Sequence, residues 1–108
     1  MKGNDQVIAQ LNELLAGELT AIDQYFIHSR MYENWGYGKL YERIAHEVQD
    51  ETQHADALIK RILFLEGTPD LSKREPLHVG RTVQEMLKND LAVELKVVSD
   101  LRRVMGFC

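Results

Sequence analysis

The sequence predicts an all-α fold: a helical bundle with one long crossover, in a single domain over residues 1–108. Apolar residues recur at three- and four-residue spacing over three long segments, the period of amphipathic helices. Two glycines in "NWGYGK" make a short link after the first segment, and both prolines fall in one non-periodic stretch before the third. These observations indicate three helices, of which the first two are antiparallel neighbours.

The first helix is expected over about 5–34. At 1.5 Å per residue, roughly 30 residues give a length of about 45 Å. Its apolar stripe consists of Val7, Leu11, Leu14, Leu15, Ile22, Tyr25, Phe26 and Tyr32.

The second helix is expected over about 39–66, with Gly67 as its C-cap and Pro69 just beyond. Its stripe consists of Leu40, Ile44, Val48, Ala55, Leu58, Ile62 and Leu65.

The stretch 67–81 is expected to be a crossover. Its last fourteen residues, 68–81, would reach roughly 46 Å when extended, one helix length, so the third helix can run parallel to the second. That helix is expected over about 82–106, where "TVQE" forms a capping box between Thr82 and Glu85. Its stripe consists of Leu87, Leu91, Val98, Leu101 and Met105.

The net charge and the cysteine content limit which binding partners and which cellular compartment the sequence favours. The net charge of -4 argues against nucleic acid and anionic membranes, which favour basic surfaces. Cys108 is the single cysteine, so no internal disulfide can form, and the first ten residues lack the apolar core of a signal peptide. We therefore expect a cytoplasmic protein.

Each expected helix carries one glutamate within its apolar stripe: Glu18, Glu51 and Glu94. An isolated buried carboxylate costs several kcal/mol unless it is paired, protonated or bound to a metal. No lysine or arginine lies within the stripes, and His54 follows Glu51 by one turn. A shared cation is the simplest way to accommodate the three carboxylates.

A single glutamate in a helical stripe more often reaches water from the flank, and Glu-x-x-His alone is a weak motif. Three such glutamates with a histidine favour a metal site. Oxygen ligands with an imidazole suit iron or manganese better than zinc. Two facing glutamates and one Glu-x-x-His are three quarters of a di-iron carboxylate bundle, whose second Glu-x-x-His comes from a fourth helix.

The segments "LNELLAGELTAIDQYFIHSRMYENWG", "HEVQDETQHAD", "RILFLEGTPDL" and "EMLKNDLAVEL" closely resemble bacterioferritin, the bacterial ferritin-like iron-storage family. The resemblance implies a ferritin-like four-helix bundle, of which this chain supplies the first three helices. The same resemblance to bacterioferritin implies that about twenty-four such subunits assemble into a hollow shell. Within each bundle a ferroxidase centre would oxidise Fe(II) with oxygen or peroxide, and ferric mineral would collect in the cavity for iron storage and detoxification.

The resemblance also assigns roles to residues. Glu18 would be a terminal iron ligand, Glu51 a bridging ligand, His54 a terminal imidazole and Glu94 a carboxylate from the third helix. Tyr25 would be a core aromatic that can donate an electron near the iron.

His46 and Asp50 lie one turn apart on the side of the second helix away from Glu51. Their spacing alone is typical of a solvated face. The resemblance implies instead a secondary iron site facing the cavity. His28 and His78 are interpreted as ordinary surface or flank residues.

Two features depart from the family pattern. Thr52 occupies the position of the haem-ligand methionine, and its hydroxyl is a poor ligand for haem iron. A shell of this chain alone should therefore lack haem b, and a second, haem-binding subunit would share a mixed shell. A ferredoxin would drive iron release, as in the family.

The family's fourth helix, with the second Glu-x-x-His, would follow residue 108. Three helices should leave an apolar seam and one iron position short of ligands. The alternatives to a ferroxidase are a non-catalytic structural subunit of a mixed shell and an inactive truncated fragment. A metal-free helical interaction module would leave the three glutamates unexplained.

Overall fold

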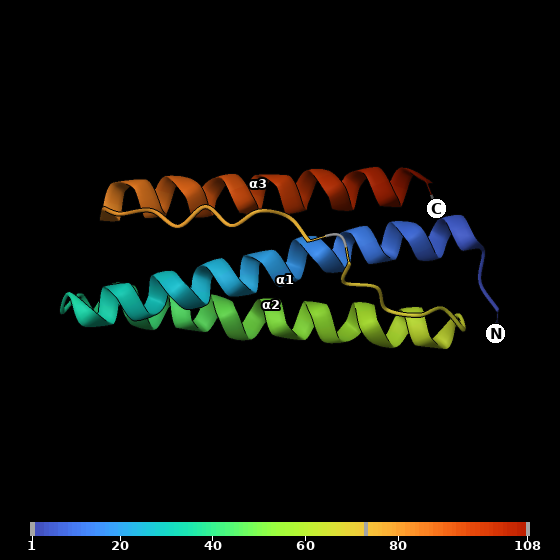
Figure 1. Ribbon diagram of the computed structural model, residues 1–108, viewed down its shortest axis with the longest axis horizontal. Coiled ribbons are helices and arrows are strands. Elements are labelled where there is room, and N and C mark those ends of the chain that lie inside the picture. Colours follow the sequence, from blue (N-terminus) through green and yellow to red (C-terminus); the bar gives the residue numbers. More distant parts are fainter. Residues whose placement is uncertain (1, 73, 108) are drawn as a thin grey trace.

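The computed structural model describes residues 2–72 and 74–107, and Cys108 lies outside the described residues. It contains three helices in an elongated body of 49 × 21 × 20 Å. Helix α1 is Asp5–Asn34, α2 is Gly38–Phe64 and α3 is Val83–Phe107. Figure 1 shows α1 and α2 antiparallel, the crossover returning along the bundle, and α3 running parallel to α2. The prediction of an all-α bundle with one long crossover is confirmed.

Helix α1 begins at a polar cap. The Asn4 side chain accepts a hydrogen bond of 2.7 Å from the amide of Gln6, which satisfies one of the free N–H groups of the first turn. After Asn34, a link of three residues turns the chain, with Gly36 at a φ of 83° that favours glycine. So short a link places α2 directly against α1.

Helix α2 ends two residues before the expected position. The amide of Gly67 donates to Ile62 O at 2.9 Å and that of Glu66 donates to Leu63 O at 3.0 Å, the two bonds of a Schellman motif. The residue in the left-handed conformation is Glu66, with a φ of 61°, so the expectation that Gly67 would take this place is wrong. Gly67 is needed for close packing instead, because a Cβ there would lie 2.8 Å from the Ile8 side chain.

The crossover between α2 and α3 is held by side chains of the helices. Asn12 contacts Thr68 O and the Asp70 amide, at 3.2 and 2.8 Å. Further along, the Gln24 side chain accepts from the amide of His78 at 3.0 Å. These bonds satisfy backbone groups that have no partner within secondary structure.

His28 is another of these ties, so its interpretation as a surface or flank residue is wrong. Its side chain is fully buried. Nε2 accepts a hydrogen bond of 3.0 Å from the Gly80 amide, which leaves Nδ1 to donate to Asp90 Oδ1 at 2.8 Å. His28 therefore joins α1, the crossover and α3. His78 is exposed.

The capping box at the start of α3 is present in altered form. The Glu85 amide donates to Thr82 Oγ1 at 3.2 Å, as expected. The Glu85 carboxylate accepts from the amide of Arg81 rather than from that of Thr82, at 2.9 Å. The first turn is thereby fixed to the end of the crossover.

Helix α1 lies at the centre of the packing. It contacts both α2 and α3, whereas among the described residues no Cα of α2 lies within 8 Å of a Cα of α3. Buried residues of α1, including Leu15, Ala21, Tyr25 and Tyr32, form the core with Ile44, Ala55 and Ile62 of α2 and Met86 of α3.

The expected stripe of α3 is not the face that packs on α1. Buried contacts come from Met86, Asp90, Val97 and Val104. The expected stripe lies beside them and is exposed: Leu87, Leu91, Val98, Leu101 and Met105. We call these five residues the open stripe. In α1, Phe26 of the expected stripe is also exposed.

A membrane-crossing helix, which needs a long and strongly apolar sequence, is not found among the described residues.

Candidate metal centre

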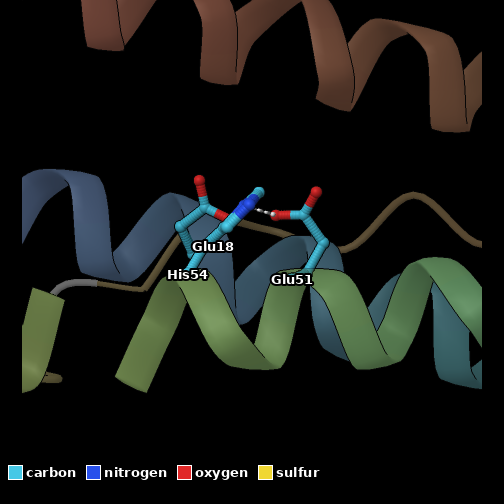
Figure 2. A group of neighbouring side chains, drawn as sticks. All are labelled: Glu18, Glu51 and His54. Atoms are coloured by element: carbon cyan, nitrogen blue, oxygen red, sulfur yellow. Dashed lines mark ion pairs between the residues drawn. The ribbon is translucent and has the colours of Figure 1, made fainter. Parts of the chain in front are cut away.

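Two carboxylates and an imidazole meet between α1 and α2. Glu18 comes from α1, and Glu51 and His54 come from one face of α2, three residues apart. Figure 2 shows the three side chains converging, with α3 on the far side of the group. His54 Nδ1 lies 3.6 Å from Glu18 Oε2 and 3.4 Å from Glu51 Oε2. One ligand atom from each residue lies within 4.8 Å of the others, so the three can hold one metal ion.

The antiparallel packing of α1 on α2 creates this arrangement. Glu18 follows Leu14 and Leu15 in the buried face of α1, and Glu51 is followed by buried Ala55 in α2. The apolar residues bury these faces and take the glutamates with them. Glu18 is 3% exposed and Glu51 is 4% exposed.

Burial raises the pKa of both carboxylates. Desolvation is the main cause that raises the pKa of Glu18 above its usual 4.5. Desolvation also raises the pKa of Glu51 to about 7, and the hydrogen bond and charge of Glu18 add to this rise.

Neither carboxylate has a lysine or arginine partner in the described part of the chain. Glu18 Oε2 and Glu51 Oε2 are buried without a hydrogen-bond partner. Such groups cost free energy in the folded state, and a bound cation would remove that cost.

Glu94 enters from α3 and is held by Tyr25. The Tyr25 hydroxyl donates a hydrogen bond of 2.5 Å to Glu94 Oε1. Tyr25 is 2% exposed, and burial followed by the Glu94 hydrogen bond raises its pKa. Glu94 and Glu51 also form a three-carboxylate group with Glu47, a residue that the sequence analysis did not single out.

His46 and Asp50 lie apart from this cluster. His46 Nδ1 is 3.4 Å from Asp50 Oδ2, and their side chains are 66% and 44% exposed. Within the described residues they do not meet a third metal-binding side chain.

Thr52 is exposed on α2, and its hydroxyl donates to the carbonyl of Val48 at 2.7 Å. This bond engages the hydroxyl proton within the helix, and the side chain has only a hard oxygen and no soft donor atom.

Comparisons with known proteins agree with the geometry. A family model described as a ferritin-like domain matches residues 8–108. A bacterial ferritin of Paramagnetospirillum magnetotacticum is 61% identical over all 108 residues, which cover 66% of that protein. A bacterial ferritin of Pseudomonas aeruginosa is 56% identical, with 70% covered, and a bacterioferritin of Mycobacterium leprae is 46% identical, with 68% covered. The chain thus spans about two thirds of the length of these relatives.

Proposed function

The chain belongs to the ferritin family, and we propose that it stores iron by oxidising Fe(II) at a di-iron centre in its helical bundle. The ferric product would be deposited as mineral inside a hollow oligomeric shell. One observation carries this proposal. Glu18 and Glu51 are buried, neither pairs with a lysine or arginine among the described residues, and both lie with His54 within reach of one cation.

In this proposal Glu18 and His54 are terminal ligands, and Glu51 is shared between two iron positions. Glu94 supplies a carboxylate from α3, and Tyr25 of α1 holds this carboxylate by a hydrogen bond. A mixture of carboxylate oxygens and an imidazole suits iron. The negative charge of the cluster also favours Fe(III) over Fe(II), since preorganised charges stabilise the more highly charged ion.

Fe(II) is the substrate of the reaction. Two Fe(II) ions each give one electron to oxygen, which takes up two protons and leaves as hydrogen peroxide. The protein gathers the ions and accommodates their charge. Because the pKa of Glu51 is about 7, its carboxyl group can give up a proton near neutral pH when a cation arrives. Tyr25 is a candidate electron donor, being buried and hydrogen-bonded to a proposed ligand.

Other parts of the proposal concern the assembled protein. His46 and Asp50 would bind iron in transit at the cavity surface. A fourth helix would cover the open stripe and supply the remaining ligands. The shell would contain about twenty-four subunits, the number that the resemblance to bacterioferritin implies. We place it in the cytoplasm, with a ferredoxin as the reductant for release.

Haem b is not expected in a shell made of this chain alone. Thr52 offers no thioether, and its hydroxyl is engaged with Val48 O. A second subunit with a methionine at this position would bring haem into a mixed shell.

The test is aerobic oxidation of Fe(II), followed by ferric absorbance and oxygen consumption. We expect rapid oxidation by the protein and its loss in Glu18→Gln and in His54→Ala. Glu42→Gln, an exposed glutamate on α2, is the matched control and should behave as the parent. Equal rates for the parent, Glu18→Gln and His54→Ala would exclude the proposed centre.

A second candidate function is a non-catalytic structural subunit of a mixed shell. Thr52 favours it, because its hydroxyl cannot replace a haem-ligand methionine and haem binding would need a methionine-bearing subunit. Here the chain would co-assemble with a methionine-bearing subunit and add no oxidation rate of its own. Comparing shells that contain the parent chain with shells that contain Glu18→Gln separates the two functions.

A further inference from the structure

We propose that Gln24, His28 and Asp90 are positioning residues, which hold Glu94 and Tyr25 in place beside the candidate metal centre. They act through these two neighbours and do not themselves bind iron. The inference rests on the proposed function in one respect, because that function makes Glu94 an iron ligand from α3.

The backbone of α3 is placed beside the metal centre by α1 rather than by α2. Glu18, Glu51 and His54, which form the first metal position, lie on α1 and α2. No Cα of α3 lies within 8 Å of a Cα of α2 in the part of the chain that the structure describes. The place of Glu94 relative to the first position therefore depends on how α3 packs on α1.

Asp90 is the polar member of the buried face of α3. Its buried neighbours on this helix include the apolar Met86, Val97 and Val104. Apolar packing is non-directional, whereas a hydrogen bond needs a defined distance and angle. Asp90 is therefore the buried residue that can fix the rotation of α3, and it lies one turn before Glu94 on the same face.

Two side chains of α1 hold Asp90 in the same way. Gln24 Nε2 donates to Asp90 Oδ1 at 3.0 Å, and Gln24 Oε1 accepts from the His78 amide at 3.0 Å. His28 Nδ1 donates to the same Asp90 oxygen at 2.8 Å, and His28 Nε2 accepts from the Gly80 amide at 3.0 Å. Each side chain thus bridges the crossover and α3, and the two bridges meet at one atom.

The two bridges lie next to the residues that serve the metal centre. Gln24 and His28 flank Tyr25 in the sequence of α1. The Tyr25 hydroxyl lies 3.5 Å from the backbone carbonyl oxygen of Asp90 and donates to Glu94 Oε1 at 2.5 Å. One turn of α3 therefore carries both the fixed point and the proposed ligand, and Tyr25 contacts both ends of that turn.

Burial makes the two bridges necessary. Gln24 and His28 are fully buried, and Asp90 is 7% exposed. Among residues 2–72 and 74–107, Asp90 pairs with no lysine or arginine, and its Oδ2 atom is buried without a hydrogen-bond partner. The bonds to Oδ1 therefore compensate the buried carboxylate, and a rotation of α3 would break both of them.

Stability alone does not require a polar junction at this place. Apolar side chains of similar volume stabilise a buried junction about as well as paired polar groups do. The hydrogen bonds to Asp90 add a defined orientation, which a metal ligand needs from the residues that support it. This precision is located one turn from Glu94, where the proposed function can use it.

The test is the rate of aerobic Fe(II) oxidation by Asp90→Leu, which removes the acceptor of both bridges and keeps an apolar side chain of similar volume. We expect kcat to fall by about tenfold or more, because a misplacement of about 1 Å can cost about 100-fold. KM should change little, since the first metal position is intact. The matched control is Val97→Ala, which removes buried contacts of the same helix and should lower stability but keep the kcat of the parent.

Two further variants separate position from charge and from folding. Asp90→Asn keeps an oxygen that accepts from Gln24 and His28, so it should restore kcat. Gln24→Met removes one bridge at similar volume and should lower kcat several-fold even if Asp90→Leu does not fold. Parent-like kcat in Gln24→Met and in folded Asp90→Leu would overturn the proposal, and so would equal losses in Asp90→Leu and Asp90→Asn.

A second measurement does not depend on iron. With ¹³C at Cζ of the tyrosines, the nuclear magnetic resonance signal of Tyr25, identified by its loss in Tyr25→Phe, reports the hydrogen bond to Glu94. In metal-free protein it should shift in Asp90→Leu and stay in place in Val97→Ala and Asp90→Asn. An unshifted signal in Asp90→Leu would overturn the positioning role and leave the proposed function intact. No Fe(II) oxidation by the parent would overturn the proposed function, and the Tyr25 signal would still decide whether the bridges position Tyr25 and Glu94.

Discussion

Helix α2 carries two pairs of an acid and a histidine, and the nitrogen-to-oxygen distance is the same in both pairs. His54 Nδ1 lies 3.4 Å from Glu51 Oε2, and His46 Nδ1 lies 3.4 Å from Asp50 Oδ2. The pairs differ in the exposure of the acid, which is 6% for the Glu51 side chain and 44% for that of Asp50. A short distance therefore does not identify a metal site on this helix.

The surroundings of the acid decide the chemistry. Water can solvate Asp50, so its pairing with His46 is optional. Glu51 is buried beside Glu18 and belongs to the three-carboxylate group with Glu47 and Glu94. Burial, with the hydrogen bond and charge of Glu18, raises the pKa of Glu51 to about 7. Burial removes the water that would solvate the first pair, and a bound cation would take its place. The comparison can be tested by altering each pair separately.

Removing the acid of each pair should give the largest contrast. Glu51→Ala should weaken the first Mn(II) equivalent by at least about 100-fold, because metal sites lose about 10- to 100-fold from an outer partner alone. Asp50→Ala should leave this equivalent unchanged. Both affinities are measured by an anaerobic titration with Mn(II), in which loss of the free-ion electron paramagnetic resonance signal counts the bound ions. Equal losses in the two variants would show that exposure does not separate the pairs.

The affinity of the first position should depend on pH through Glu51. A cation must displace the proton that Glu51 holds below about pH 7. The affinity should rise about tenfold for each pH unit up to that value and then level off. Titrations at several pH values, with Asp50→Asn as the control, measure the slope. A flat profile for the parent would contradict the burial argument.

The stability of the metal-free protein should change in the opposite sense. The folded-state pKa of Glu51 is about 7 and its ordinary value is 4.5, so between these values the folded state retains a proton that the unfolded state has lost. The free energy of unfolding should therefore fall as pH rises through this window, by roughly 1–3 kcal/mol. Urea denaturation across the window should show a smaller decrease in Glu51→Gln, and an equal decrease would point to other groups.

Tyr25 is hydrogen-bonded to Glu94, so a change at Tyr25 tests the buried carboxylates without altering Glu51 itself. Tyr25→Phe removes the hydroxyl that donates to Glu94 Oε1 and should cost about 1 kcal/mol of stability. It should also lower the affinity for a second Mn(II) ion, at the position that Glu94 serves, by several-fold. The affinity for the first ion, at Glu18, Glu51 and His54, should not change. Tyr37→Phe, on an exposed tyrosine, is the control. An equal effect on both equivalents would mean that Tyr25 does not act through Glu94.

The exposed pair should give the smallest effect. His46→Ala should change stability by less than about 0.5 kcal/mol, as expected of a surface position. Thermal unfolding of the metal-free protein measures this. A loss above 1 kcal/mol would mean that the pair is structural rather than a solvated site.

The sequence predicted much of the fold because long amphipathic periods determine helices. It also led to Glu18 and Glu51, since a carboxylate within a buried stripe is visible as a break in the pattern. The end of α2 was harder to predict from the sequence, because Glu66 takes the left-handed conformation that glycine usually adopts. Which face of α3 packs on α1 depends on the path of the crossover, and the period alone does not reveal it.

Two residues near the site were missed for different reasons. His28 looked ordinary because its partners, Gly80 and Asp90, are distant in sequence. Glu47 lies one turn before Glu51, where a glutamate is equally typical of a solvated face. Its neighbour Glu94 comes from another helix, so only the folded structure brings the group together. Periodicity could have flagged Glu47 as a member of the row with Glu51 and His54.

Hydrogen bonds and close packing at the end of the crossover fix the position of α3 along the bundle. The Gly80 amide is bound to His28, and a Cβ at Gly80 would lie 2.6 Å from the Met86 amide, so the start of α3 has no freedom to slide. A shift of one residue would move Glu94 by about 1.5 Å along the bundle and turn it by about 100°. An extra residue between Gly80 and Met86 would therefore carry Glu94 out of step with Glu51. Insertions and deletions between Gly80 and Met86 are therefore excluded if Glu94 is to stay beside Glu51.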